Sequence, residues 1–389
     1  MLRRRIGLAL LALAAVVVLS IGWDRSQSRG NDFDNFHDAA VSVWREGALL
    51  LDKSTLRYPP TFQVSLSPLG AFSLPVASAL WLALNVAALA CLPFAFARLS
   101  GTPPARQGFA WFLVAPFVVS NVTLGQSGPL LVALATLGML AAAAGRPVAG
   151  GFALAWAGLL KVFPGALVAV PFVLGRARGV LLGTLLAFGV AGLWVSAAIG
   201  PRAGLDDFGR WIQEVRHEQT PRQLFEVGRS LRYNNQGLAV TLIRSLSVDW
   251  NPRPQIAAKG SLQVLALPVP VVWGLYYAIV AALAATLVAC SLRARRRPTR
   301  RAFLGLQALA IPAMLALSPI VWTHYFLWWL PAAVYLADRT RLLAALGTVS
   351  LLGIFWVPAR ALGLHMAITL VLFALGARRL WHETEPDPR

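Results

Sequence analysis

Charged residues are scarce in this sequence, where Asp, Glu, Lys and Arg make up 13% of the 389 residues and hydrophobic residues make up 57%. Soluble globular proteins carry roughly 25% charged residues. The missing charge excludes a soluble globular fold, because too few polar side chains are present to cover a water-exposed surface. The mean hydropathy of +0.64 points the same way. We therefore predict a membrane protein, for which the lipid bilayer is the main solvent.

The sequence has few cysteines and lacks glycine-rich nucleotide-binding motifs. Cys91 and Cys290 are the only two cysteines, and each lies inside an apolar stretch. A disulfide framework or a cysteine-based metal site is therefore not expected. The sequence contains neither a P-loop nor a dinucleotide-binding fingerprint. An energy source, if the protein needs one, must arrive with its substrate or as an ion gradient.

Positive charge is abundant, and its placement indicates membrane topology. A net charge of +19 would suggest nucleic acid binding in a soluble protein, but here the arginines form short clusters between apolar stretches. Cytoplasmic loops of membrane proteins are rich in Lys and Arg, so we predict cytoplasmic N- and C-termini and no nucleic acid partner. The clusters that recur at every second helix end are Arg3–Arg5, Arg98 with Arg106, Arg146, Arg176 with Arg178, Arg293 to Arg301, Arg339 with Arg341, and Arg378–Arg379.

The apolar stretches predict an all-α polytopic membrane protein with about 12 membrane-spanning helices, in a range of about 10 to 13, because each span needs roughly 20 apolar residues. Residues 1–22 are interpreted as an uncleaved first helix, since no small-residue cleavage site follows them. Residues 148–161 and 164–175 form either one kinked helix or a broken pair, because proline interrupts the run. The expected helices are residues 6–23, 75–98, 108–122, 128–144, 148–161, 164–175, 179–199, 264–292, 302–317, 324–338, 341–358 and 361–377.

We predict one membrane domain over residues 1–389 with two long outer loops. The first loop, 24–74, and the second, 200–262, contain nearly all acidic residues outside the tail 378–389, which is predicted to be cytoplasmic. Each loop also contains an amphipathic segment with apolar residues at helical spacing. We predict that these segments are interfacial helices and that polar chemistry gathers on the outer face of the membrane.

Asp32 is the candidate general base. A carboxylate near a bilayer boundary can deprotonate a sugar hydroxyl if a hydrogen-bond partner holds it in place. Four acids lie between Asp24 and Asp38, so a solvated loop acid is the alternative interpretation of any one of them. Asp32 is favoured over Asp34 and Asp38 because it begins the amphipathic segment, and an acid is well placed at the N-terminus of a helix.

Lys161 is one of only three lysines, and it follows the apolar run from Ala153 to Leu160. A charge at that depth is costly and usually faces a polar cavity. We predict that its ammonium group pairs with a phosphate. The alternative is that the side chain reaches toward the outer interface, with Pro164 ending the helix.

His324 follows the helix-breaking pair Ser318-Pro319 and stands beside Trp322 and Tyr325. A lone histidine among aromatic residues is often merely interfacial, but the break favours a position lining a cavity. His324 would there bind a phosphate oxygen or position the acceptor, and the sequence does not choose between these roles.

Polar residues of the outer segments complete the candidate site. Arg210 and Arg216 depart from the positive-inside trend, which indicates recognition of an anion such as a lipid phosphate, unless nearby glutamates neutralise them. Proline-rich and polar turns are candidates for the walls of a pocket, although the turn around Gln126 is equally compatible with a plain loop between helices. The predicted pocket-lining or acceptor-contacting residues are Asp34, Tyr58, Gln126, Asn234, Asn235 and Trp322.

Short motifs in a fixed order carry a family resemblance over most of the chain. They are Asp32-Phe33-x-x-Phe36-x-x-Ala39-Ala40 with Gly47, Tyr58-Pro59-Pro60 with Ser67-Pro68-Leu69 and Trp81, Leu124-Gly125-Gln126, Ala149-Gly150, Leu160-Lys161-Val162-Phe163-Pro164, Asn234-Asn235-Gln236, and Ser318-Pro319-Ile320-Val321-Trp322-Thr323-His324. In this order they resemble glycosyltransferase family 87, membrane mannosyltransferases of the GT-C superfamily that use polyprenyl-phosphate sugars.

The resemblance implies a GT-C-type helical bundle, and the high Ala, Arg and Trp content is typical of a high-GC bacterium, so we predict location in a bacterial inner membrane. The resemblance also implies inverting transfer of a mannosyl or related sugar from a polyprenyl-phosphate donor to a glycolipid or glycan acceptor on the extracytoplasmic face. Asp32 matches the presumed base of the family, and Lys161 and His324 match polar positions near the donor phosphate. Many relatives carry a second His or another polar residue where this chain has Tyr325, which leaves the use of that corner open.

No metal or other cofactor is expected, because a polyprenyl phosphate is already a good leaving group when cationic side chains stabilise it. Two other functions compete with a glycosyltransferase. A secondary transporter or lipid flippase would be expected to carry intramembrane charges in both halves of the chain. A non-catalytic membrane scaffold would leave the clustered polar motifs unexplained.

Overall fold

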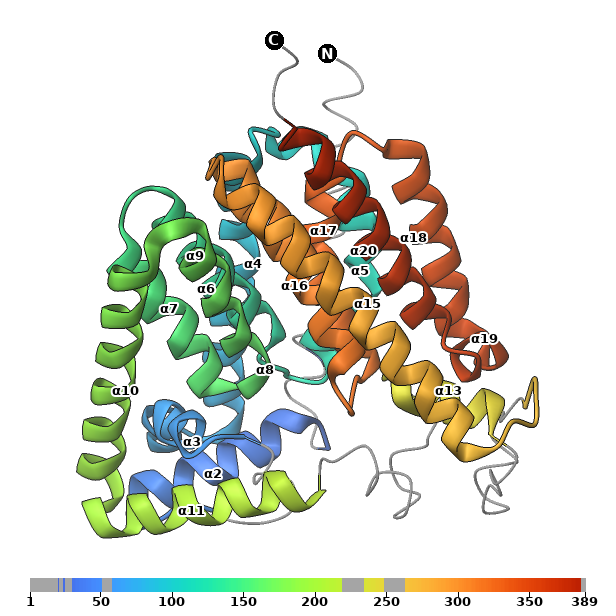
Figure 1. Ribbon diagram of the computed structural model, residues 1–389. Coiled ribbons are helices and arrows are strands. Elements are labelled where there is room, and N and C mark those ends of the chain that lie inside the picture. The colour runs from blue at the N-terminus through green and yellow to red at the C-terminus, as the bar shows by residue number, and fades with distance from the viewer. Residues whose placement is uncertain are drawn as a thin grey trace. The chain divides into compact units, whose positions relative to one another are not determined.

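The computed structural model describes residues 20, 24, 30–50, 58–218, 234–247 and 263–385, and these residues form helices with no strand among them (Figure 1). The predicted first helix, 6–23, lies outside the described residues except for Ser20. The described chain divides into two compact units. The first unit comprises Met1–Gly108, Val118–Phe172 and Arg176–Arg216, and the second comprises Phe109–Phe117, Val173–Gly175 and His217–Arg389. The single membrane domain over residues 1–389 stays a prediction.

The first unit contains the N-terminal helices and a bundle of apolar helices. Figure 1 shows α6, α7 and α10 side by side, and α7 contacts both of its neighbours along their lengths. α7 and α10 approach closely because Gly151 of α7 lies against the backbone of Val180, where an added Cβ atom would be 2.4 Å from the Val180 oxygen. The elements are α2 (Asp32–Glu46), α3 (Pro60–Leu66), η1 (Ser67–Ala71), α4 (Leu74–Ser100), η2 (Pro104–Arg106), the end of α5 (Gly108–Thr123), α6 (Gly128–Ala143), α7 (Pro147–Leu160), α8 (Val162–Gly165), η3 (Ala166–Val168), α9 (Ala169–Pro171), α10 (Ala177–Ile199) and α11 (Pro201–Glu218).

The second unit is built around α16, whose residues are mostly buried. Figure 1 shows α15, α16 and α20 side by side, in agreement with their mutual contacts. α20 continues through the first residues of the tail that we predicted to begin at residue 378. The elements are the beginning of α5, α13 (Leu238–Leu246), α15 (Val269–Arg295), α16 (Arg300–Leu317), η5 (Thr323–Trp329), α17 (Leu330–Tyr335), α18 (Thr340–Phe355), α19 (Val357–Ala361) and α20 (Leu364–Glu383).

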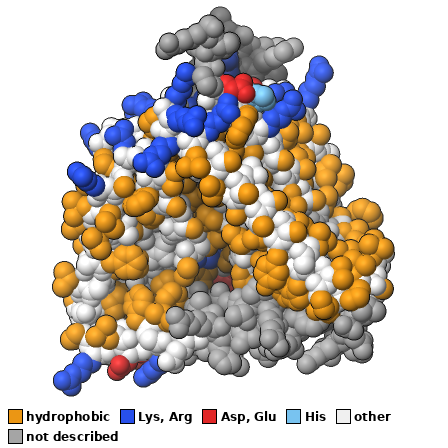
Figure 2. All heavy atoms as spheres, viewed as in Figure 1, with side chains coloured by type: hydrophobic (Ala, Val, Ile, Leu, Met, Phe, Trp, Pro, Cys, Tyr) orange, Lys and Arg blue, Asp and Glu red, His pale blue; other side chains and the backbone are white. Residues whose placement is uncertain are grey.

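Five helices of the described residues are long and apolar enough to cross a membrane. They are Leu74–Ser100, Val162–Ile199, Val269–Arg295, Arg300–Leu317 and Leu364–Glu383, and the shorter apolar helices are Gly108–Thr123, Gly128–Ala143, Pro147–Leu160 and Thr340–Phe355. Figure 2 shows hydrophobic side chains over much of the visible face and Lys and Arg side chains gathered mainly toward its upper edge. These are the features of a polytopic helical membrane protein. The count of about 12 spans stays a prediction.

The helix is interrupted at Lys161. This interruption decides whether residues 148–175 form one kinked helix or a broken pair of helices. α7 ends at Leu160, and Lys161 adopts an extended conformation with φ −155° and ψ 121°. α8 begins at the next residue, Val162. Two helical segments therefore meet at Lys161 as a broken pair, and the helix does not simply bend at a proline.

The amphipathic segment of the first loop is helix α2, which ends at Glu46 and is capped by Gly47 with φ 61°. Its apolar stripe is covered by η1 and α3 of the same unit. The five residues Phe33, Phe36, Ala39, Ala40 and Val43 are each at most 5% exposed. Protein therefore covers this stripe, whereas an interfacial helix would turn it toward lipid.

Candidate active site

Asp32 lies in the first turn of α2, and the preceding residue caps this helix. The Asn31 side-chain oxygen accepts hydrogen bonds from the backbone N–H groups of Phe33, at 2.8 Å, and Asp34, at 3.3 Å. Such an N-cap satisfies donors that have no partner within the helix. The backbone N–H of Asp32 also donates to the carbonyl oxygen of Leu124 at 3.0 Å. The position of Asp32 is therefore set by its own helix and by the turn that follows α5.

Gln126 of that turn holds the Asp32 carboxylate. Its Nε2 donates to Asp32 Oδ2 at 2.5 Å, and its Oε1 accepts from the Tyr58 hydroxyl at 3.1 Å. Gln126 is 5% exposed and Tyr58 is 8% exposed. Three residues predicted from sequence, namely Asp32, Tyr58 and Gln126, thus form one hydrogen-bonded chain in the first unit.

The turn that carries Gln126 depends on a glycine and a tryptophan. Gly125 has φ +66°, and a Cβ atom there would lie 2.6 Å from Cβ of Phe33. Trp81 of α4 donates from its indole Nε1 to the Gly125 oxygen at 2.8 Å and stacks on Phe33 with ring centroids 5.7 Å apart. The sequence indicated Trp81 only through the family resemblance. In the structure, Trp81 contacts both the Gln126 turn and Phe33 of α2.

Lys161 belongs to the same group of side chains. Its Nζ lies over the Tyr58 ring at 5.1 Å from the centroid, a distance at which the cation is attracted to the aromatic face. The broken helix at Lys161 gives the side chain this position, since the extended residue interrupts the regular helical direction. The first unit therefore brings a carboxylate, an amide, a phenol and an ammonium group together.

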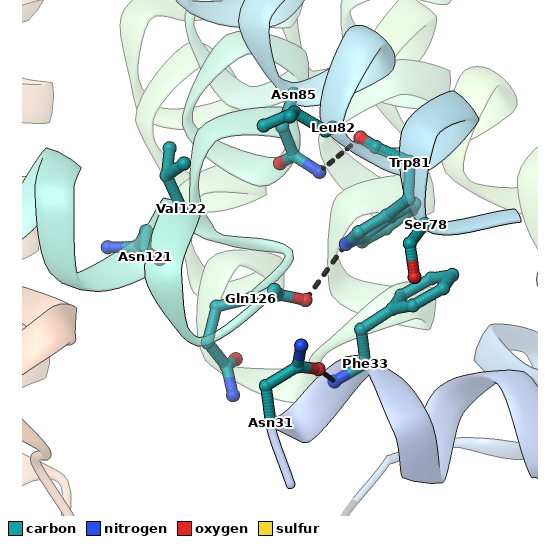
Figure 3. A pocket seen from close by; sticks show the side chains of 10 residues that line it. Asn31, Phe33, Ser78, Trp81, Leu82, Asn85, Asn121, Val122 and Gln126 are labelled. Atoms are coloured by element: carbon teal, nitrogen blue, oxygen red, sulfur yellow. Dashed lines mark hydrogen bonds between the residues drawn. The ribbon is translucent and has the colours of Figure 1, made fainter. Parts of the chain in front are cut away.

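A small recess lined by both polar and apolar residues lies beside the Gln126 turn (Figure 3). Figure 3 shows Asn85, Trp81 and Gln126 around it. Ser78 and Asn85, which sequence reasoning missed, are each 3% exposed, and Ser78 Oγ and Asn85 Oδ1 have no hydrogen-bond partner among the described residues. Buried polar atoms of this kind are normally completed by water or by a ligand. The lining residues are Asn31, Phe33, Ser78, Trp81, Leu82, Asn85, Asn121, Val122, Gly125 and Gln126.

A second polar cluster, in the second unit, forms around Asn235. Its Oδ1 accepts from the N–H groups of Gly237, at 3.0 Å, and Val321, at 2.9 Å, and its Nδ2 donates to the Pro319 oxygen at 3.2 Å. Asn235 also pairs with Trp322 in an isolated antiparallel bridge. The predicted residues Asn235 and Trp322 thus lie together, and the amide of Asn235 binds protein groups.

Arg244 and Arg360 belong to this cluster, and the sequence analysis did not select them. Arg244 donates to the backbone oxygens of Ala361, Asn235 and Arg360 at 2.7, 3.1 and 3.3 Å. Burial lowers its pKa to about 10, so the guanidinium remains charged at neutral pH. Arg360 Nη1 lies 3.4 Å from Oδ1 of Asn234. The one signal in the sequence was a charge inside the apolar run of residues 238–246.

The structure also describes the predicted residues His324, Arg210 and Asp34. His324 is buried at 9% exposure, and its ring contacts Tyr325 edge-on with centroids 4.8 Å apart. The Arg210 side chain is 65% exposed, and its Nη1 lies 3.5 Å from Oδ1 of Asp207 on the same helix. The Asp34 carboxylate accepts from the backbone N–H of Gly30 at 2.5 Å.

The side chain of Arg216 lies outside the described residues. Across the described part of the chain, no group of three His, Cys, Asp or Glu side chains is arranged to hold a metal ion.

The described residues form an all-helical membrane fold, in which the Asp32 carboxylate is held by a hydrogen bond and Lys161 lies in the same group of side chains. The protein is therefore an integral membrane protein with a candidate active site. The family model of glycosyltransferase family 87 matches residues 56–319, which is more than half of the chain. The chain belongs to glycosyltransferase family 87 and is therefore a glycosyltransferase. No curated protein and no solved structure matches it. The family assignment favours a transferase over a transporter, a lipid flippase or a scaffold.

The matched range covers part of the candidate site. It includes Tyr58, Gln126 and Lys161, but it begins after Asp32 and ends before His324.

Proposed function

We propose that the protein transfers a mannosyl or related sugar from a polyprenyl-phosphate donor to a hydroxyl group of a glycolipid or glycan acceptor, with Asp32 as the general base. The observation that carries this proposal is the 2.5 Å hydrogen bond from Gln126 Nε2 to the Asp32 carboxylate. A general base must be held in a defined orientation toward the proton that it removes. In a glycosyltransferase, the proton in question is that of the acceptor hydroxyl.

The proposed reaction is a single displacement. The Asp32 carboxylate takes the proton of the acceptor hydroxyl, and the acceptor oxygen attacks the anomeric carbon of the donor sugar. A new glycosidic C–O bond forms, while the bond between the anomeric carbon and the phosphate oxygen breaks. The electron pair of that bond leaves with the polyprenyl phosphate. One displacement inverts the configuration at the anomeric carbon.

Lys161 is the proposed contact for the departing phosphate. The phosphate gains negative charge as the bond breaks, and a fixed cation stabilises that charge in the transition state. This role is supported by the placement of Lys161 Nζ over Tyr58, whose hydroxyl donates to Gln126. His324, Arg210 and Arg216 are proposed as further phosphate contacts, and Asp34, Asn234, Asn235 and Trp322 as residues that line the substrate pocket.

The decisive experiment compares the wild-type protein with Asp32→Asn at matched expression in purified membranes. Sugar transfer from synthetic polyprenyl-phosphate mannose is measured with lipid extract as acceptor. We expect the amide variant to lose at least about 100-fold in kcat, because amide nitrogen cannot take the proton. The control is Asp38→Asn, a change of a neighbouring acid on α2. Unchanged turnover in Asp32→Asn would assign the base to another acid.

Metal dependence gives a second prediction. Because cationic side chains are proposed to stabilise the leaving phosphate, we expect transfer to continue in an excess of a metal chelator, with at most weak stimulation by divalent ions. The measurement is the transfer rate in chelator and after readdition of magnesium or manganese. Full loss in chelator with recovery on readdition would contradict the proposal.

A further inference from the structure

We infer that Gln126 and Tyr58 are positioning residues for Asp32 and do not serve as contacts for the sugar substrates. The inference rests on the proposed function, in which Asp32 is the general base. Gln126 sets the orientation of the carboxylate, and Tyr58 sets the orientation of the Gln126 amide. We assign the proton of the acceptor hydroxyl to Oδ1 of Asp32, because the hydrogen bond from the Gln126 amide makes Oδ2 the less basic oxygen.

The hydrogen-bonding capacity of the Gln126 amide supports this assignment. Its nitrogen faces the Asp32 carboxylate and its oxygen faces the Tyr58 hydroxyl, so each end of the amide already has a protein partner. The reverse orientation would place the amide oxygen 2.5 Å from a carboxylate oxygen, and two acceptors repel each other. With 5% of its surface exposed, the Gln126 side chain has little area left for a substrate.

Hydrogen bonds to backbone atoms fix both Asp32 and the turn that carries Gln126. The Asp32 N–H donates to the Leu124 oxygen at 3.0 Å, two residues before Gln126. Gly125 lies between Leu124 and Gln126 in the sequence, and its backbone oxygen accepts a hydrogen bond from the Trp81 indole Nε1 at 2.8 Å. A group held in this way loses little freedom when the transition state forms, which is the physical benefit of a positioning residue.

The chemistry of the amide suits the task. An uncharged donor orients the carboxylate without neutralising it, whereas Lys or Arg at this position would form a salt bridge. Tyr58 is itself fixed, since its ring stacks on Phe62 with centroids 4.4 Å apart and meets Phe36 edge-on at 5.0 Å. The direction of the Tyr58 hydroxyl is therefore determined by aromatic packing.

Tyr58→Phe is the cleanest variant, because it removes the hydroxyl and keeps the ring that packs on Phe62 and faces Lys161. Gln126→Glu keeps the shape of the side chain but turns an acceptor toward Asp32, and Gln126→Ala removes the partner. We measure kcat, and KM for donor and acceptor separately, for these variants, for the double variant Tyr58→Phe/Gln126→Ala and for Asp32→Asn.

For a positioning role, kcat falls about 10- to 100-fold in Gln126→Ala and Gln126→Glu, and both KM values stay within about 2-fold. Tyr58→Phe loses less, about 3- to 10-fold, and the double variant is no worse than Gln126→Ala, because Tyr58 acts through Gln126. The matched control is Gln63→Ala. Gln63 is also a buried amide, 2% exposed, but it bonds the backbone of Leu50, so kcat is expected to stay within about 2-fold.

The outcomes separate the inference from the proposed function. If Asp32→Asn retains wild-type turnover, the proposed base is wrong whatever Gln126 does. If Asp32→Asn is inactive while Gln126→Ala raises KM and keeps kcat, Gln126 is a substrate contact and the inference is overturned. Additive losses in the double variant would overturn the role of Tyr58. Should Gln126→Ala fail to fold, Tyr58→Phe and Gln126→Glu still decide through the same kinetic constants.

Discussion

At the scale of residues, the candidate site depends on side chains that touch no reacting group. Gly125 leaves room for Phe33, Trp81 binds the Gly125 oxygen, and Asn31 caps the helix that begins with Asp32. The two hydrogen-bonded contacts, the Trp81 bond and the Asn31 cap, are ordinary in strength, each worth about 1 kcal/mol. Together they determine where a single carboxylate oxygen points.

Gly125 provides a test at this scale. We expect Gly125→Ala to lower the free energy of unfolding by about 2–4 kcal/mol, because the left-handed backbone is strained and the new Cβ atom meets Phe33. The displaced turn should also reduce kcat by moving Gln126. The measurements are thermal unfolding in detergent and sugar transfer in membranes.

Gly101→Ala is the matched control for this change. Gly101 also has a positive φ, +74°, but an added Cβ atom there meets nothing within 4 Å. We expect only the cost of the backbone strain, about 1 kcal/mol, and normal transfer. Equal effects of the two substitutions would show that the contact with Phe33 does not matter.

At the scale of elements, irregular backbone places the polar groups. The break between α7 and α8 gives Lys161 its position, and the turn between α5 and α6 carries Gln126. In the second unit, the buried Arg244 of α13 binds the backbone oxygens of Arg360 and Ala361 in α19 and of Asn235. Irregular segments in a membrane protein require such partners, because lipid offers none.

Arg244→Met tests the contribution of the hydrogen bonds between α13 and α19 to stability. The variant keeps an apolar side chain but removes the guanidinium donors that bind the Ala361, Asn235 and Arg360 oxygens, so we expect a loss of about 2–4 kcal/mol of unfolding free energy. Arg296→Met, a change of an exposed arginine next to α15, should cost less than about 0.5 kcal/mol. Thermal unfolding in detergent compares the two variants, and equal melting temperatures would contradict the structural role of Arg244.

At the scale of the whole molecule, the proposed topology places α11 outside the cell and the arginines after α15 in the cytoplasm of a bacterium. Cytoplasmic enrichment in Lys and Arg is the physical basis for this orientation. The proposed donor and acceptor are lipid-linked, so an extracytoplasmic site would receive both from the outer leaflet. The membrane lipids are thus proposed as partners as well as solvent.

Cysteine labelling tests this topology. In a protein without Cys91 and Cys290, an exposed position on α11, Arg202→Cys, should react with a membrane-impermeant maleimide in intact cells. Arg296→Cys should react only after the membrane is permeabilised. The opposite pattern would invert the proposed topology, and normal sugar transfer by both variants serves as the control for folding.

Much of the fold was predictable because it depends on local sequence. Residues 75–98 and 128–144 were predicted as helices, and the structure contains α4 at Leu74–Ser100 and α6 at Gly128–Ala143. Hydrophobic length sets such helices, since the backbone must satisfy its own hydrogen bonds in lipid. The start of α2 was predictable for a similar reason, because capping and stop signals lie within a few residues of the helix ends.

The sequence by itself determined a helical membrane protein, the positions of regular apolar helices such as α4 and α6, and the short list that contained Asp32, Tyr58, Gln126 and Lys161. Only the tertiary structure decided which of these meet. Gln126 and Asp32 are 94 residues apart, and Arg244 and Ala361 are 117 apart. Apolar periodicity reports which face of a helix is buried, but it carries no information about the partner that covers it. Contacts between distant segments depend on packing, and packing is a property of the folded chain.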